Sequence, residues 1–244
     1  MKTKNNTQTK STLAALAGLA LAAGSAHAGT WASYAWNDDA DLLLSSSTTY
    51  THAIDFANGT TGTEVVANIN GVSFTQYEFG GWVSGAKAGT DLTSGNGWSM
   101  TNNWGFNGSF GAGPAGTESA KLTEGFILPP NTVTGEWTLT LSGLSANTDY
   151  IFTLFSPMYD AGPRTATLDG LDDGVGVNVR SQTEDNTQVQ YAYNTGAGTT
   201  FDLVVADSAA AYGFPAFTNE VVPEPSTTAL LGLGGVALVL RRRK

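Results

Sequence analysis

Carboxylates are the side chains in this sequence whose number and spacing most readily suggest chemistry. They fall into three short clusters: Asp38, Asp39 and Asp41, then Asp169, Asp172 and Asp173, and finally Glu184 with Asp185. Two carboxyl groups that face each other across a cleft could hydrolyse a glycosidic bond, but spacing along strands does not fix the distance between them. A glycoside hydrolase with an unlocated carboxylate pair is therefore one open alternative.

The second cluster is also the best candidate for a metal site. Residues 169–174 read Asp-Gly-Leu-Asp-Asp-Gly, so hard oxygen ligands crowd a turn that glycine makes flexible, which suits Ca²⁺. The segment lacks the alternating ligand spacing of an EF-hand loop. The competing interpretation is a solvated turn between two strands, where Asp and Gly are common. We expect no other cofactor.

Nucleophilic and His-dependent catalysis have little support in the sequence. The chain has no Cys and two His residues, His27 and His52. His52 alternates in phase with Tyr50, Ile54 and Phe56, which favours a packed strand residue over a general base. The Gly-x-Ser-x-Gly elbow of α/β-hydrolases is also missing. We therefore predict no catalytic residue and no enzymatic activity.

A segment rich in aromatic and amide side chains, residues 97–110, is a candidate for carbohydrate binding. Trp98 and Trp104 could stack on sugar rings, and Asn102 and Asn103 could bond sugar hydroxyls. The alternative is a long loop whose aromatic side chains anchor it to the core, the commoner fate of large aromatics. The binding interpretation implies an exopolysaccharide as partner.

The N-terminus has the three-part order of a secretory signal peptide. Basic residues among the first ten precede an apolar run over 13–23, which is too short for a membrane span, and small residues follow. Ala26 and Ala28 fit the two small-residue positions of a signal peptidase site, so cleavage is predicted before Gly29. The sequence thus predicts an N-terminal signal helix within residues 1–28, and export.

The C-terminus carries the most specific motif of the chain. Pro223, Glu224 and Pro225 precede a run over 229–240 that is apolar or Gly, and the chain ends in Arg241, Arg242, Arg243 and Lys244. This order resembles the PEP-CTERM sorting signal, a bacterial motif that combines a Pro-Glu-Pro tripeptide, a short membrane helix and a basic tail. A basic tail held in the cytoplasm places the preceding residues beyond the inner membrane. Residues 221–244 are thus expected to include one transmembrane helix.

The resemblance implies a sorting enzyme as partner. PEP-CTERM proteins look like substrates of exosortase, a membrane-embedded enzyme that acts near the tripeptide and releases or transfers the protein to the cell exterior. The implied course is transient anchoring in the inner membrane, followed by arrival at the cell surface or outside the cell. Pro223 and Pro225 keep the tripeptide extended, a form that a protease cleft can bind.

Between these two signals the hydrophobic pattern has a period of two. Strands are predicted over 50–56, 64–69, 72–79, 137–141, 150–155, 175–180, 189–193 and 201–205, and Asn70-Gly71 indicates a type I′ hairpin. Leu144 and Tyr150 resemble the tyrosine corner of fibronectin type III domains. More strands follow Tyr150 than such a domain needs, which favours an all-β, antiparallel sandwich of jelly-roll type formed by one domain, residues 29–220.

The charge distribution excludes one class of partner. The net charge is −10, but most basic residues lie near the two ends, and residues 29–222 hold four basic against twenty acidic side chains. Such a surface repels polyanions, so no nucleic acid is expected as a partner. The sequence favours a structural or interaction protein of the cell surface or extracellular matrix, with a carbohydrate-binding module and a glycoside hydrolase as alternatives.

Overall fold

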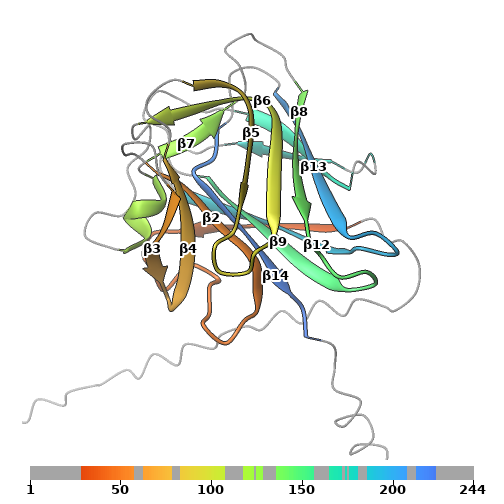
Figure 1. The fold of residues 1–244 in the computed structure, drawn as a ribbon, viewed down its shortest axis with the longest axis horizontal. Coiled ribbons are helices and arrows are strands. Elements are labelled where there is room, and N and C mark those ends of the chain that lie inside the picture. Colours follow the sequence, from red (N-terminus) through yellow and green to blue (C-terminus); the bar gives the residue numbers. More distant parts are fainter. Residues whose placement is uncertain are drawn as a thin grey trace, which may run out of the picture.

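Two β-sheets make up the part of the chain that the computed structural model describes (Figure 1). The described residues are 29–57, 63–78, 83–107, 118–123, 125–128, 136–156, 165–171, 174, 176–180, 186–207 and 213–223. Their elements, in chain order, are β1 (Thr30–Trp36), β2 (Tyr50–Ala57), β3 (Thr63–Ile69), β4 (Val72–Glu78), β5 (Val83–Thr90), β6 (Gly97–Asn107), the 3-10 helix η1 (Glu118–Thr123), β7 (Gly125–Leu128), β8 (Glu136–Ser142), β9 (Asp149–Ser156), β10 (Thr165–Gly170), β11 (Val177–Arg180), β12 (Asn186–Asn194), β13 (Thr200–Asp207) and β14 (Ala216–Val221).

Each sheet has seven strands. Sheet A has the order β1-β12-β9-β14-β2-β4-β3, and sheet B has the order β11-β10-β13-β8-β6-β5 with β7 paired to β6. The β2–β4 pair is parallel, whereas the other pairings of described strands are antiparallel. This pair corrects the expectation of a purely antiparallel sheet. It arises because the second strand of the β3–β4 hairpin lies beside β2 and runs in the same direction as β2.

A shared apolar core joins the facing sides of the two sheets. In β8, Trp137, Leu139 and Leu141 are buried and the intervening threonines are half-buried, which confirms the predicted alternation. Across the core, the Phe152 ring of sheet A lies 5.2 Å from the Phe201 ring of sheet B, centroid to centroid. Each large side chain buried in this way stabilises the fold by about 1.5–3 kcal/mol. The two sheets therefore pack as a β-sandwich.

The outer face of sheet A has a second, smaller apolar cluster. Leu42 and Leu44, from the segment between β1 and β2, and Leu122, from η1, are buried together with Phe155 and Ala216 of the sheet. These elements cover part of a face that would otherwise meet solvent. The outer face of sheet B differs, because half-exposed threonines of β8 and β10 lie there.

Two turns confirm predictions made from local sequence. Asn70 and Gly71 join β3 to β4 with φ values of 53° and 81°, the left-handed conformations that a type I′ turn requires. The Tyr150 hydroxyl accepts a hydrogen bond from the Ser145 backbone N–H at 2.9 Å, and Leu144 is buried beside it. This geometry is the tyrosine corner expected at the start of β9.

The main local error concerns residues 97–110, which the sequence suggests are a loop. Residues Gly97–Asn107 form strand β6, paired with β5, with β7 and, near Trp98, with β8. Neighbouring strands on both sides supply hydrogen-bond partners for its backbone, and the sequence of the segment by itself does not reveal these partners. The expected signal helix and transmembrane helix lie outside the described residues. Within the described ranges, no helix has the length and apolar character needed to cross a membrane.

Candidate functional site

The junction between the sandwich and the C-terminal segment is fixed by backbone hydrogen bonds. Strand β14 lies between β9 and β2, inside sheet A, and leaves the sandwich at its lower end in Figure 1. Beyond the strand pairing, the Val221 N–H donates to the Thr49 carbonyl and the Val222 N–H donates to the Asp149 carbonyl, each at 2.9 Å. Pro223 follows, exposed and without an N–H. The folded sandwich therefore extends to the residue before the Pro-Glu-Pro tripeptide.

A carboxyl group with a raised pKa, that of Glu220, lies at the same end of β14. Burial raises the pKa of Glu220 to about 7, and a hydrogen bond from the Tyr50 hydroxyl opposes part of that shift. The Tyr50 hydroxyl also accepts a hydrogen bond from the Ser45 backbone N–H at 3.1 Å. Sequence reasoning missed Glu220, because its burial results from the pairing of β14 with β2, two strands that lie far apart in the sequence.

His52 is fully buried between the sheets, which confirms the predicted packed residue. Its Nε2 lies 2.9 Å from the Gly97 carbonyl, which can only accept, so Nε2 carries a proton, and Nδ1 lies 3.2 Å from the Thr51 hydroxyl oxygen. Burial lowers the pKa of His52, and the Gly97 carbonyl and the Asp91 carboxylate offset part of this effect. The ring is thus a neutral link between β2 and β6.

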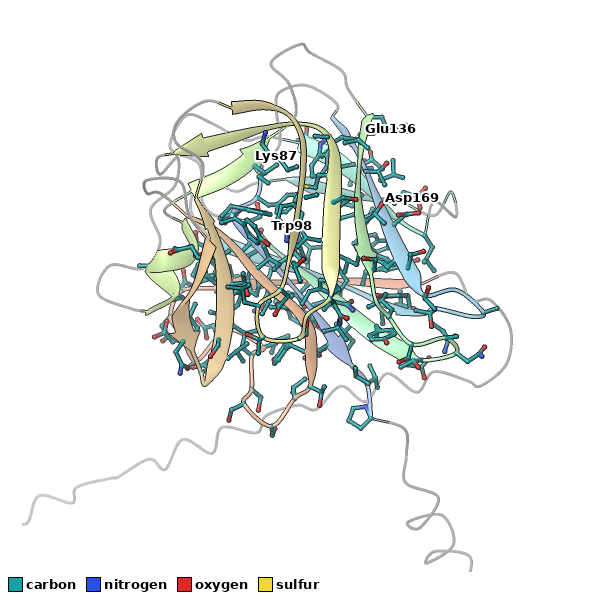
Figure 2. The ribbon with its side chains drawn as sticks, viewed as in Figure 1. Lys87, Trp98, Glu136 and Asp169 are labelled. Carbon is teal, nitrogen blue, oxygen red and sulfur yellow. The ribbon has the colours of Figure 1, made fainter. Side chains whose placement is uncertain are left out.

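The predicted carbohydrate platform is not formed by Trp98. This side chain is 3% exposed, and its ring meets the Tyr77 ring edge to face at a centroid distance of 4.9 Å. Figure 2 shows it in the interior of the sandwich. A buried ring cannot offer its face to a sugar, so Trp98 contributes to the core. The other members of the predicted set belong to β6 with side chains outside the described residues: Asn102, Asn103 and Trp104.

The candidate calcium segment begins on the outer face of sheet B, where Figure 2 labels Asp169. One carboxylate oxygen of Asp169 accepts a hydrogen bond from the Gly174 backbone N–H at 3.0 Å, and Leu171 has a positive φ of 63°. This closes a turn after β10. Asp172 and Asp173 lie outside the described residues. Among the residues that are described, no group of three or more His, Cys, Asp or Glu side chains is placed to hold a metal ion.

The first carboxylate cluster holds the loop after β1 in shape. Asp38 accepts hydrogen bonds from the N–H groups of Ala40 and Asp41, at 2.8 and 3.1 Å. Asp39 accepts one from the Ser119 N–H at 2.8 Å, which ties the loop to η1. These carboxylates therefore have a structural role in the loop. The third cluster, Glu184 with Asp185, lies outside the described residues.

A small pocket of about 200 Å³ lies where β2 and the segment before it meet the β3–β4 hairpin and the segment after β5. Its lining includes the polar residues Ser46, Thr48, Tyr50, Ser73, Asp91 and Thr93. The Asp91 carboxylate is buried and accepts three backbone N–H bonds, from Ala53, Thr93 and Ser94, at 2.7 to 2.9 Å. Sequence reasoning missed this pocket, because several separate segments form it.

Comparison with known proteins decides the nature of the C-terminal segment. A family model for the PEP-CTERM protein-sorting motif matches residues 221–244. The chain carries a PEP-CTERM sorting motif. A comparison with curated proteins gave no match for any part of the chain.

The PEP-CTERM match contains the residues that the sequence singled out at this end. Pro223 is the last described residue, and the rest of the tripeptide and the basic tail, Glu224, Pro225, Arg241, Arg242, Arg243 and Lys244, lie outside the described residues. The motif supports an exported protein of the cell envelope or surface that exosortase processes. Because β14 ends at Val221, the sorting motif follows the sandwich without a linker.

The N-terminal end of the sandwich coincides with the predicted cleavage site. Ala26 and Ala28 lie outside the described residues, whereas Gly29 is the first described residue, one before β1. The Gly29 N–H donates to the Tyr191 hydroxyl at 3.0 Å. Any Cβ at position 29 would overlap the Tyr191 ring, so the structure requires glycine there.

Proposed function

We propose that this chain is an exported structural or interaction protein of the cell surface or extracellular matrix, sorted by exosortase. The observation that carries the proposal is the PEP-CTERM motif at 221–244, placed directly after the final strand of a folded sandwich. A signal peptide over 1–28, removed by signal peptidase, starts export. The apolar run over 229–240 then anchors the chain transiently in the inner membrane, with the basic tail in the cytoplasm.

The exported part is, in this proposal, one sandwich of jelly-roll type formed by residues 29–220. The strand order supports this topology. Strands β2, β14, β9 and β12 are neighbours in sheet A, and β8, β13, β10 and β11 are neighbours in sheet B. Eight strands divided between two sheets in this interleaved order fit a jelly roll, with the remaining strands extending the sheets.

A non-enzymatic role has support from the residues that could have supplied catalysis. His52 is enclosed between the sheets and links β2 to β6. The carboxylates of Asp38, Asp91 and Asp169 each accept backbone N–H bonds that hold turns. Each of these groups thus has a structural use in the fold.

Sorting is tested by expressing the full chain with and without a cognate exosortase. We expect the C-terminal residues to be lost, and the protein to leave the inner membrane, only in the strain that expresses exosortase. Replacing Glu224 by Gln in the tripeptide should reduce this conversion, whereas Glu136→Gln, the same change at an exposed position on β8, should not. Mass spectrometry of the C-terminus and membrane fractionation give the readout. A chain that keeps its C-terminus in both strains would disprove sorting.

A second candidate function is binding of one sugar unit of an exopolysaccharide, and the pocket beside Tyr50 favours it. The lining combines hydroxyl groups, one carboxylate and the carbon surface of Ala53 and Val72. A volume of 200 Å³ is below the roughly 300–1,000 Å³ of pockets for drug-sized ligands, and suits a small polyhydroxylated ring. The Asp91 carboxylate disfavours anionic sugars.

Sugar binding is tested by titrating the host exopolysaccharide and neutral monosaccharides into the protein and following NMR shifts. Thr93→Val and Ser73→Ala remove hydroxyls from the pocket lining and should weaken binding. Thr138→Val, on the outer face of sheet B, is the matched control. Equal binding by the wild type and the pocket variants would exclude this site.

A further inference from the structure

The sandwich restricts where the Pro-Glu-Pro tripeptide can lie. Val222 is held by its hydrogen bond to the Asp149 carbonyl, and an extended chain covers at most about 3.6 Å per residue. Pro225, three residues later, therefore lies within about 11 Å of Val222. On the other side, Ala229 starts the apolar run four residues after Pro225, at most about 14 Å away. Before processing, the tripeptide is thus confined between the sandwich and the bilayer.

The chain cannot easily lengthen this strip by releasing β14. The strand is paired with β9 on one side and with β2 on the other. Its Phe217 is fully buried in the core between the sheets, against Phe152 and Phe56. Pulling the strand out would expose these rings to water, at about 1.5–3 kcal/mol for each buried side chain. A sorting enzyme therefore meets the tripeptide next to a folded surface.

Three segments form the surface around the point where the chain leaves, and we call them the exit face: residues 45–49, 145–149 and 195–198. The first two supply the carbonyls that hold Val221 and Val222, from Thr49 and Asp149. The third is joined to the second, because the Thr195 N–H donates to the Thr148 carbonyl at 3.2 Å. Most of these residues are exposed, and internal hydrogen bonds fix their backbone.

The composition of the exit face favours one kind of contact. Its residues are Ser, Thr, Asn, Ala and Gly with a single charged side chain, Asp149. A face that binds anionic lipid headgroups needs clustered Lys or Arg, and these segments contain neither. Small hydroxyl and amide groups on a rigid backbone suit a close protein contact, because little entropy is lost on binding.

We propose that the exit face is a docking surface for the membrane-embedded sorting enzyme, so that the enzyme contacts the folded sandwich as well as the tripeptide. The proposal rests on sorting by exosortase. Its physical reason is the short distance between the tripeptide and Val222. An enzyme that encloses residues 223–225 also contacts the residues around Val222. Recognition thus includes the shape of the sandwich end in addition to the motif.

The test uses one bulky, charged substitution at matched exposed alanines. Ala146→Arg and Ala197→Arg alter the exit face, and Ala88→Arg places the same side chain on exposed β5. With exosortase co-expressed, we expect the two exit-face variants of the full chain to be converted about tenfold more slowly, which corresponds to about 1.4 kcal/mol. The β5 variant should be converted at the wild-type rate. Conversion of both exit-face variants at the wild-type rate would overturn the proposal.

A flexible spacer distinguishes loss of docking from effects of the substitutions on folding or export. Ten Gly and Ser residues between Val222 and Pro223 add a mean span of about 17 Å, which lets the enzyme engage the tripeptide away from the sandwich. In chains with the spacer, the exit-face substitutions should no longer slow conversion. If they slow it to the same degree, they act through folding or export and the proposal is wrong. Failure of sorting itself is distinct, because then neither the wild type nor the spacer chain responds to exosortase.

Discussion

Replacing Glu220 by Gln should remove a pH dependence from the stability of the sandwich. Glu220 lies at the end of β14, where burial raises its carboxyl pKa from 4.5 to about 7. The nearby titratable group that affects it is the Tyr50 hydroxyl of β2, whose hydrogen bond lowers the Glu220 pKa in part. Glutamine keeps the size of the side chain and cannot ionise.

The sign follows from proton binding in the two states. The folded pKa exceeds the unfolded value, so the folded state binds the proton more tightly. Its contribution to stability is fully present below the unfolded pKa of 4.5 and is lost as the pH rises through 7. A shift of this size corresponds to at most about 3.4 kcal/mol at 1.36 kcal/mol per pKa unit. Partial exposure of the carboxylate reduces the expected loss to about 1–2 kcal/mol.

The measurement is urea unfolding of the purified protein, followed by the fluorescence of its buried tryptophans, at about pH 5 and about pH 8. The difference in unfolding free energy between Glu220→Gln and the wild type should rise by about 1–2 kcal/mol between these conditions, in favour of the variant. Glu136→Gln, at an exposed position on β8, is the control for a general effect of lost charge. A difference that stays constant with pH would refute the assignment of this dependence to Glu220.

Three further predictions concern other positions. Gly29→Ala places a methyl group against the Tyr191 ring and should cost about 1–3 kcal/mol of stability, measured by thermal unfolding, so an unchanged melting temperature would contradict the contact. Trp98→Ala removes a ring from the core and should lower the free energy of unfolding by about 3–5 kcal/mol, measured by urea unfolding. An unfolding midpoint equal to that of the wild type would show that the ring is not packed there. We also propose that calcium binds the turn after β10, so that excess Ca²⁺ raises the melting temperature relative to EDTA and Asp169→Asn abolishes the rise. Equal melting temperatures in the wild type would end the calcium hypothesis.

Local chemistry made several features predictable. Alternation of buried and polar residues locates β8, because a strand that covers a core has a period of two. The hairpin at Asn70-Gly71 follows from the positive φ that both positions need. The PEP-CTERM motif is equally local, since order and composition over its short length define it.

Strand β6 shows where this reasoning stops. Gly, Asn and Ser are abundant in Gly97–Asn107 and favour turns over strands. The segment is a strand because β5 and β8 pair with its backbone on either side. The alternation of Trp98 with Met100, both buried, was the one local signal that could have revealed it.

The same limit applies to the candidate sites. A period of two separates the side chains of a strand into two sets, but it does not say which set faces the core, and this left Trp98 open to both interpretations. The raised pKa of Glu220 and the pocket beside Tyr50 both depend on segments far apart in the chain. Burial is a property of the assembled sheets, so no short stretch of sequence contains it.

The sequence alone determined the sorting motif and located most of the strands, because these depend on order, charge and periodicity within a few residues. The tertiary structure decided which side chains are enclosed, where carboxylates hold turns, and that β14 is bound to the sandwich up to Val222. The physical reason is that desolvation and strand pairing arise between residues that the chain brings together only on folding.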